Sequence, residues 1–182
     1  MAQWKDGDFY DCSFSVHKSR RYHAKMRAFY RTCYNLTVAA TAVTGSAAFV
    51  SLLGSATMLA KWLTGVVAIA STLELVFRLS KKADLHDDLC RRFTKLAADM
   101  EKMEPTNENL QNARAQRLLI ERDEPTERRL IDLVAQNEES RARGVSPEDL
   151  VPISGPQRLF GYIFTFGMGR IDNWWSQKHR TN

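Results

Sequence analysis

The side chains suited to catalysis or metal binding are few, and their spacing matches no known reactive site. Four histidines and three cysteines are scattered along 182 residues. His86 has Asp87 and Cys90 nearby on one expected helix, but a packed histidine is the simpler interpretation. Phosphate-binding glycine loops and the nucleophile motif GxSxG are absent from the sequence. We therefore predict no enzymatic activity, no cofactor and no metal. One acidic run is typical of a solvated face: Glu121, Asp123, Glu124 and Glu127.

The most informative feature is a nearly uncharged segment inside a chain that is otherwise rich in charge. Lys and Arg number 26 and Asp and Glu 21, a net charge of +5, yet residues 32–60 contain none of them. After Lys61, residues 62–73 are uncharged again. A bilayer core about 30 Å thick takes roughly 20 helical residues, so segments 36–53 and 57–79 are each long enough to cross it. Gly54-Ser55-Ala56 between them is expected to form the reversal, on the outer side of the membrane. We predict an all-α fold, in which a two-helix transmembrane hairpin continues into a cytosolic helical bundle.

The second segment carries three charged residues that need an explanation. Lys61 can extend its ammonium group to the membrane boundary. Glu74 lies toward the other end, and Arg78 follows it by four residues, which is the favourable order for a helical ion pair. Two interpretations stay open. Glu74 and Arg78 form a boundary pair, or Glu74 lines a polar channel or a helix contact.

Small residues follow one face of each uncharged segment, with Ala48 in the first and Gly65 in the second. In lipid, small residues let helix backbones approach closely. This pattern predicts helices that contact other helices, as in a homo-oligomer or the wall of a pore.

Basic residues flank the uncharged segment on both sides, where they can meet anionic headgroups at about 1 kcal/mol per charge. The positive-inside rule then places both flanks, and both termini, in the cytoplasm. This juxtamembrane position favours the lipid bilayer over nucleic acid as the partner. A soluble bundle with an uncharged centre is the alternative. The candidate membrane-surface residues here are Arg20, Arg21, Lys25, Arg27, Arg31, Lys81 and Lys82.

These patterns divide the chain into three parts. Residues 1–34 are a cytosolic basic N-terminal helix, residues 35–79 the transmembrane hairpin, and residues 80–182 a cytosolic helical region. The helix over 81–103 is expected to run straight on from the second span. Its apolar stripe is expected to pack on the N-terminal helix as an antiparallel pair.

Further along, turn and capping residues delimit shorter helices. Thr106 can cap a helix, and Gly144 can end another. The last element, 157–175, is expected to be one helix with an apolar face that includes Trp174 and Trp175. It either lies in the membrane interface or packs on the cytosolic bundle.

The residues around the paired span carry a family resemblance. Basic and aromatic residues at 20–31 precede the span, and the spacing His-x-x-Leu-x-x-x-Phe-x-x-Leu follows it within 83–96. Over residues 15–100 the chain resembles the SLATT family of bacterial two-span proteins. The family contributes no catalytic residue. The motif positions are His86, Leu89, Phe93 and Leu96, and their spacing is that of packing residues on a helix.

The resemblance implies a membrane effector of a bacterial antiviral or conflict system that perforates the membrane of an infected cell. It also implies a nucleotide-signal synthase or a sensor protein as a partner. Together with the residue patterns, it predicts an oligomeric protein of the bacterial inner membrane. Two alternatives remain: a membrane-anchored adaptor without a pore, whose cytosolic helices recruit a partner, and a soluble helical bundle.

Overall fold

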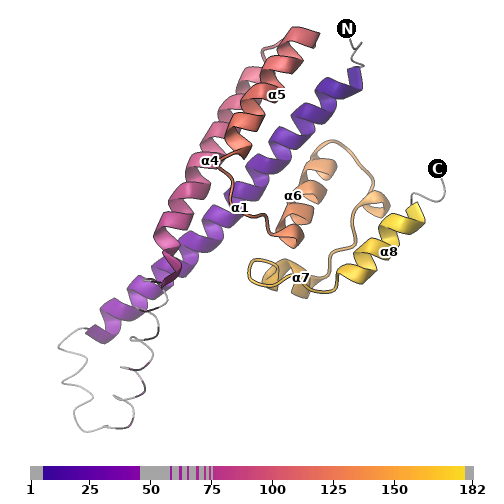
Figure 1. Cartoon of the computed structure of the whole chain (residues 1–182). Helices are drawn as coiled ribbons and strands as arrows, with labels where there is room; N and C mark the ends of the chain where they lie inside the picture. Colours follow the sequence, from indigo (N-terminus) through magenta and orange to yellow (C-terminus); the bar gives the residue numbers. More distant parts are fainter. Residues whose placement is uncertain are drawn as a thin grey trace. The chain divides into compact units, whose positions relative to one another are not determined.

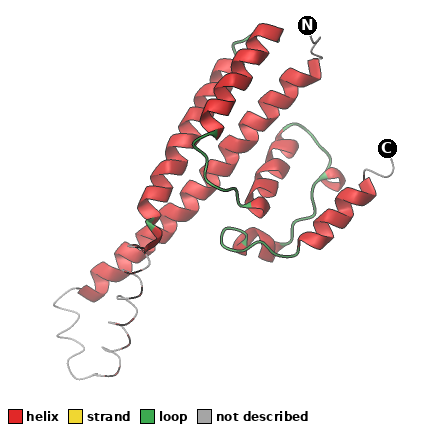
Figure 2. Ribbon diagram, viewed as in Figure 1, coloured by secondary structure: helices red, strands yellow, loops and turns green. Residues whose placement is uncertain are grey.

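The structure, a computed structural model, describes residues 6–45, six single positions between 58 and 74, and residues 76–178. Helices account for all regular structure in this part of the chain, which confirms the all-α prediction (Figures 1 and 2). The helices in chain order are α1 (Asp6–Gly45), α4 (Leu79–Met100), α5 (Asn107–Glu121), α6 (Arg129–Ala142), the 3-10 turn η1 (Pro147–Asp149), α7 (Gly155–Phe160) and α8 (Met168–Lys178).

Contacts divide the chain into two compact units. Unit 1 comprises Met1–Met26 and Asp87–Asn182, and unit 2 comprises Arg27–His86. Helices α1 and α4 each contribute to both units. The division expected from the sequence follows charge rather than contacts, and it places the end of the hairpin at residue 79, where α4 begins.

Across the described ranges, we find no helix that combines the length and the apolar character needed to cross a bilayer. A large part of the predicted hairpin, with Ala48, Lys61 and the expected reversal at 54–56, lies outside the described residues. The transmembrane hairpin therefore stays a prediction.

The first core of unit 1 forms where α1 and α4 pack side by side in opposite directions (Figure 1). The ring of His23 stacks on Phe93 with centroids 5.5 Å apart. Further along, the Cys90 thiol lies 3.7 Å from the Arg20 carbonyl. Apolar side chains of α4 recur every three or four residues and face α1 and α5, so the predicted antiparallel pair is confirmed. The buried residues of this core are Cys12, Val16, Leu89, Phe93, Leu96, Ala97, Met100, Leu110, Ala113 and Ile120.

A second core joins α6 to α8 and to the extended segment between η1 and α7. It contains Leu130, Leu133, Val151, Ile153 and Ile171. The buried Asn137 amide fixes the extended segment. It donates to the Val151 carbonyl at 2.8 Å and accepts from the Val151 amide at 2.9 Å.

Two of the expected helix ends are confirmed. The Thr106 hydroxyl accepts a hydrogen bond from the Asn109 amide and caps α5, as side-chain oxygens at this position commonly do. Gly144 follows α6 with a φ of 82°, a left-handed conformation that glycine adopts without strain.

Two other expectations are wrong. The helix over 81–103 does not run straight on from the second segment, because Arg78 interrupts it with a φ of 48° before α4 begins. The element at 157–175 is not one helix. It consists of α7, a loop and α8, and Gly167 has a φ of 65° at the start of α8.

Candidate functional site

The candidate site is a set of large apolar side chains that unit 2 leaves exposed, called the apolar surface of unit 2 below. These side chains belong to the uncharged segment and to its immediate end. Their exposed fractions run from 46 to 74%, which marks an interaction surface rather than a core. The residues are Leu36, Val38, Val43, Met58, Trp62, Ile69, Val76 and Phe77.

Part of this surface is a helical stripe. Six described positions between 58 and 76 follow one another at three or four residues, have helical conformation and are exposed, whereas Glu74 between the last two is half-buried. That spacing places them on one face of a helix. Gly65 lies midway along the stripe, and a Cβ atom built on it meets nothing within 4 Å. We call these residues the Gly65 stripe: Met58, Trp62, Gly65, Ile69, Thr72 and Val76.

Polar side chains beside the apolar surface are satisfied within their own helix. The Thr37 hydroxyl donates to the Cys33 carbonyl at 3.0 Å, and the Thr41 hydroxyl donates to the Thr37 carbonyl at 2.8 Å. A hydroxyl paired in this way can enter a medium without water at little cost.

At one end of unit 2, basic and aromatic side chains of α1 and α4 meet. The Lys82 ammonium lies 5.6 Å from the ring centroids of both Tyr30 and Phe77. Tyr30 also stacks on His86 with centroids 5.6 Å apart. Arg31 forms an exposed ion pair with Asp84 at 3.2 Å. The candidates Arg27 and Lys81 are both exposed here.

Glu74 holds the start of α4. One carboxylate oxygen accepts from the Ser80 amide at 3.3 Å and from the Ser80 hydroxyl at 3.0 Å. The other oxygen is buried without a hydrogen-bond partner among the described residues. A carboxylate at a helix N-terminus satisfies unpaired amides and complements the helix dipole. Arg78 also contacts Glu74 through the backbone, because its amide donates to the Glu74 carbonyl at 2.9 Å.

Three candidate membrane-surface residues of α1 belong to unit 1, and two of them bind α6. Arg21 pairs with Glu139 at 2.7 Å and Lys25 with Glu138 at 2.5 Å. The third, Arg20, is half-buried. The structure thus uses part of the basic run to hold α6 against α1. The sequence contains no sign of this pairing, because the partners are more than 100 residues apart.

Glu139 is the most enclosed of these acids. Its side chain is 5% exposed and also accepts from Arg143 Nε at 2.7 Å. Burial works against the charged form, but the hydrogen bonds from Arg143 and Arg21 outweigh it and hold the pKa of the carboxyl below its usual range. Glu139 is therefore a charged carboxylate at neutral pH.

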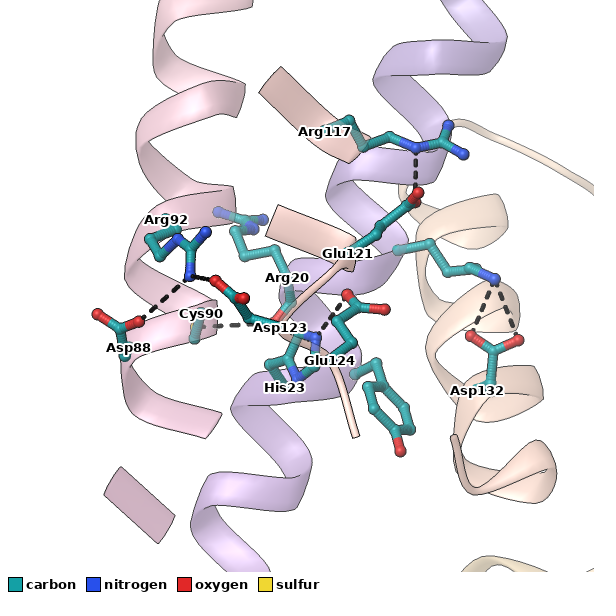
Figure 3. A network of polar contacts seen from close by, with 12 residues as sticks. Arg20, His23, Asp88, Cys90, Arg92, Arg117, Glu121, Asp123, Glu124 and Asp132 are labelled. Carbon is teal, nitrogen blue, oxygen red and sulfur yellow. Dashed lines mark hydrogen bonds and ion pairs between the residues drawn. The ribbon is translucent and has the colours of Figure 1, made fainter. Parts of the chain in front are cut away.

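The segment between α5 and α6 is fixed by a polar network (Figure 3). The ring of His23, only 1% exposed, lies 2.9 Å from a Glu124 carboxylate oxygen. Arg92 binds Asp123 at 2.8 Å and donates to the Leu119 carbonyl at 3.1 Å. The network is a structural link: in the described part of the chain, no three His, Cys, Asp or Glu side chains are grouped to hold a metal ion.

The two candidate tryptophans of α8 are half-buried rather than fully exposed. Trp174 and Trp175 contact each other edge to face at 5.1 Å and pack on the second core of unit 1. Lys178 lies 5.0 Å above the Trp174 ring. Of the two alternatives for this part of the C-terminal element, the structure shows packing on the bundle.

The four positions of the resemblance motif are all buried. His86 is 3% exposed, and Leu89, Phe93 and Leu96 are 2% exposed or less, which confirms that they are packing residues. Comparisons of the chain with protein-family models, with curated proteins and with solved structures gave no match.

Proposed function

We propose that this chain is a membrane effector of a bacterial antiviral or conflict system. Residues 35–79 enter the inner membrane as a two-helix hairpin, and both termini stay in the cytoplasm. Copies of the chain associate within the membrane and perforate or depolarise it. A nucleotide-signal synthase or a sensor protein acts as the upstream partner.

The observation that carries this proposal is the apolar surface of unit 2. The eight large side chains named above are left exposed, and in water they forgo burial free energy on the order of 10 kcal/mol. Lipid removes that penalty, and the adjoining stretch of residues 32–60 has no charge that would oppose insertion. The paired hydroxyls of Thr37 and Thr41 agree with the same environment.

The lysine, arginine and aromatic groups at one end of unit 2 are consistent with a boundary of the membrane hairpin at this position. Lys82, Tyr30 and Phe77 form one cation–π cluster next to the apolar surface. Amphipathic rings and basic side chains are characteristic of the headgroup level of a bilayer. Arg31 and Lys81 add positive charge for anionic headgroups.

Self-association is assigned to the Gly65 stripe. A glycine within an apolar helical face lets a second helix approach its backbone. A Cβ atom on Gly65 meets nothing within 4 Å in the single chain, so a side chain can begin there without a clash. The substitution Gly65→Leu tests association between copies, and insertion equal to that of the wild type shows that the single chain accepts the larger side chain.

The test is release of a small dye from liposomes that contain the purified chain. We expect the wild type to release dye and Gly65→Leu to release at least several-fold less at equal insertion. The matched control is Gly169→Leu in α8, where a Cβ atom also meets nothing within 4 Å. It should behave as the wild type does.

The two alternative functions give different results in the same preparation. An adaptor stays in the membrane after a carbonate wash but releases no dye. A soluble bundle is removed by the wash. Equal dye release by the wild type and Gly65→Leu would show that the Gly65 stripe does not mediate association between copies.

A further inference from the structure

A second apolar surface lies on unit 1, between the start of α7 and the start of α8. Within eight residues, five large side chains are 39 to 69% exposed. None of them belongs to either core of the unit. We call them the α7–α8 loop surface: Leu159, Phe160, Ile163, Phe164 and Phe166.

Hydrogen bonds and packing fix the backbone of this loop on its inner side, and its large apolar side chains stay exposed. The buried Gln157 amide donates to the Phe166 carbonyl at 3.1 Å and to the Gly167 carbonyl at 3.3 Å. Its oxygen accepts from the Ser154 amide at 2.9 Å. At Gly161 a Cβ atom would lie 3.0 Å from the Leu130 side chain, so the loop backbone rests directly on α6.

The charged residues within 150–171 are all positive, and Glu138 of α6 lines a pocket together with Arg158. Arg158 and Arg170 are exposed on either side of it, and Arg128 donates to the Ile163 carbonyl at 3.4 Å. No acidic residue occurs between Asp149 and Asp172. Among the described residues, these three arginines form no ion pair with a carboxylate.

We propose that the α7–α8 loop surface inserts into the interface of an anionic bilayer, with Arg158, Arg170 and Arg128 on the headgroups. Apolar side chains above a basic rim are the pattern of interfacial segments. A second copy is a poorer occupant. Half-exposed side chains offer about 100 Å² each, so five supply roughly 500 Å², below the ~800 Å² per partner of a typical stable interface. This contact is separate from the hairpin and does not depend on it.

The experiment places an environment-sensitive fluorophore on the loop of the full-length chain. The probe is NBD on Phe164→Cys, in a background with Cys12, Cys33 and Cys90 replaced by serine. The matched control is Leu118→Cys on α5, since Leu118 is 64% exposed and Phe164 is 63% exposed. Both proteins are combined with vesicles of phosphatidylcholine alone or mixed with phosphatidylglycerol.

We expect the NBD emission to shift to the blue at position 164 in the vesicles with phosphatidylglycerol, and not at position 118. The double variant Arg158→Gln, Arg170→Gln should reduce the ratio of inserted to water-exposed loop roughly 25-fold, because each charge near an anionic surface contributes a factor of about five. Salt at about 1 M should also weaken insertion, since it shortens the Debye length from about 10 to 3 Å.

Three results would overturn the proposal. They are no shift at position 164 with phosphatidylglycerol, an equal shift at position 118, and a shift without vesicles that disappears on dilution, which would indicate a second copy. If the serine background fails to fold by circular dichroism, hydrogen exchange of amides 162–166 in the native chain decides. Protection by anionic vesicles supports insertion, and unchanged exchange contradicts it. Carbonate extraction of the same samples reports on the hairpin alone.

Discussion

Replacing Glu139 by glutamine removes the charge that lies between two arginines from different parts of unit 1. Arg21 comes from α1, and Arg143 follows α6 directly. Each places its Nε atom 2.7 Å from a Glu139 oxygen. The exchange keeps the size of the side chain and one acceptor oxygen. Its effect is therefore electrostatic rather than a change in packing.

The expected cost follows from the hydrogen bonds and from solvent access. A hydrogen bond to a charged group contributes about 1.5–3 kcal/mol, so two such bonds set an upper bound of roughly 6 kcal/mol. The side chains of Arg21 and Arg143 are 30% and 17% exposed, so water can replace part of the lost interaction. We expect the free energy of unfolding to fall by about 2–3 kcal/mol. In a chain of this size that lowers Tm by about 4–12 °C.

The assay is thermal unfolding of the full chain in mild detergent, followed by tryptophan fluorescence. Trp174 and Trp175 pack on the core that contains residues of α6, so they report on this region. The control is Glu138→Gln at the neighbouring position. The Glu138 side chain is 37% exposed, and among the described residues its ion pair is with Lys25, so we expect a loss of at most about 1 kcal/mol.

The pH dependence gives a second check with a defined sign. The pKa of Glu139 is lowered in the folded chain, so its stabilisation is complete above the unfolded value of about 4.3 and disappears as the pH falls through the folded pKa. The Tm difference between the wild type and Glu139→Gln should therefore be full at neutral pH and shrink below about pH 4. The reasoning is refuted if Glu139→Gln and Glu138→Gln lose equal stability at pH 7. It is also refuted if the Tm difference between the wild type and Glu139→Gln grows in acid.

Two further substitutions test the cores of unit 1. Asn137→Ala leaves the buried amide and carbonyl of Val151 unpaired, so unfolding should become easier by about 3 kcal/mol. Hydrogen exchange at the Val151 amide should accelerate, and unchanged exchange would show that the contact is not needed. Phe93→Ala removes a fully buried ring and should lower the free energy of unfolding by about 3–5 kcal/mol. A Tm within a few degrees of the wild type would contradict its place in the core.

Local signals in the sequence predicted several parts of the fold correctly. The three- and four-residue spacing of Leu89, Phe93 and Leu96 marks the buried face of α4, because helix geometry alone determines it. Thr106 and Gly144 delimit helices for reasons that lie within a few neighbouring residues. Such features depend on local geometry and not on the rest of the chain.

Features that depend on distant partners were not predictable in the same way. No proline or glycine next to Arg78 indicates that the helix is interrupted there. The interruption is accompanied by hydrogen bonds from Ser80, after Arg78, to Glu74, before it. The last element divides because Gln157 binds the backbone of the loop ten residues later. The basic residues Arg21 and Lys25 have the composition of a membrane flank, yet α6 supplies their acidic partners.

Cysteine labelling in intact cells tests the membrane hairpin most directly. A membrane-impermeant maleimide applied outside should label Ser55→Cys and spare Cys33 and Cys90, because the reversal lies outside and both flanks lie inside. Burial raises the pKa of the Cys33 thiol and slows its reaction, so Cys90 and a permeabilised sample are the controls. Labelling of Cys90 in intact cells, or of Ser55→Cys only after permeabilisation, would contradict the hairpin.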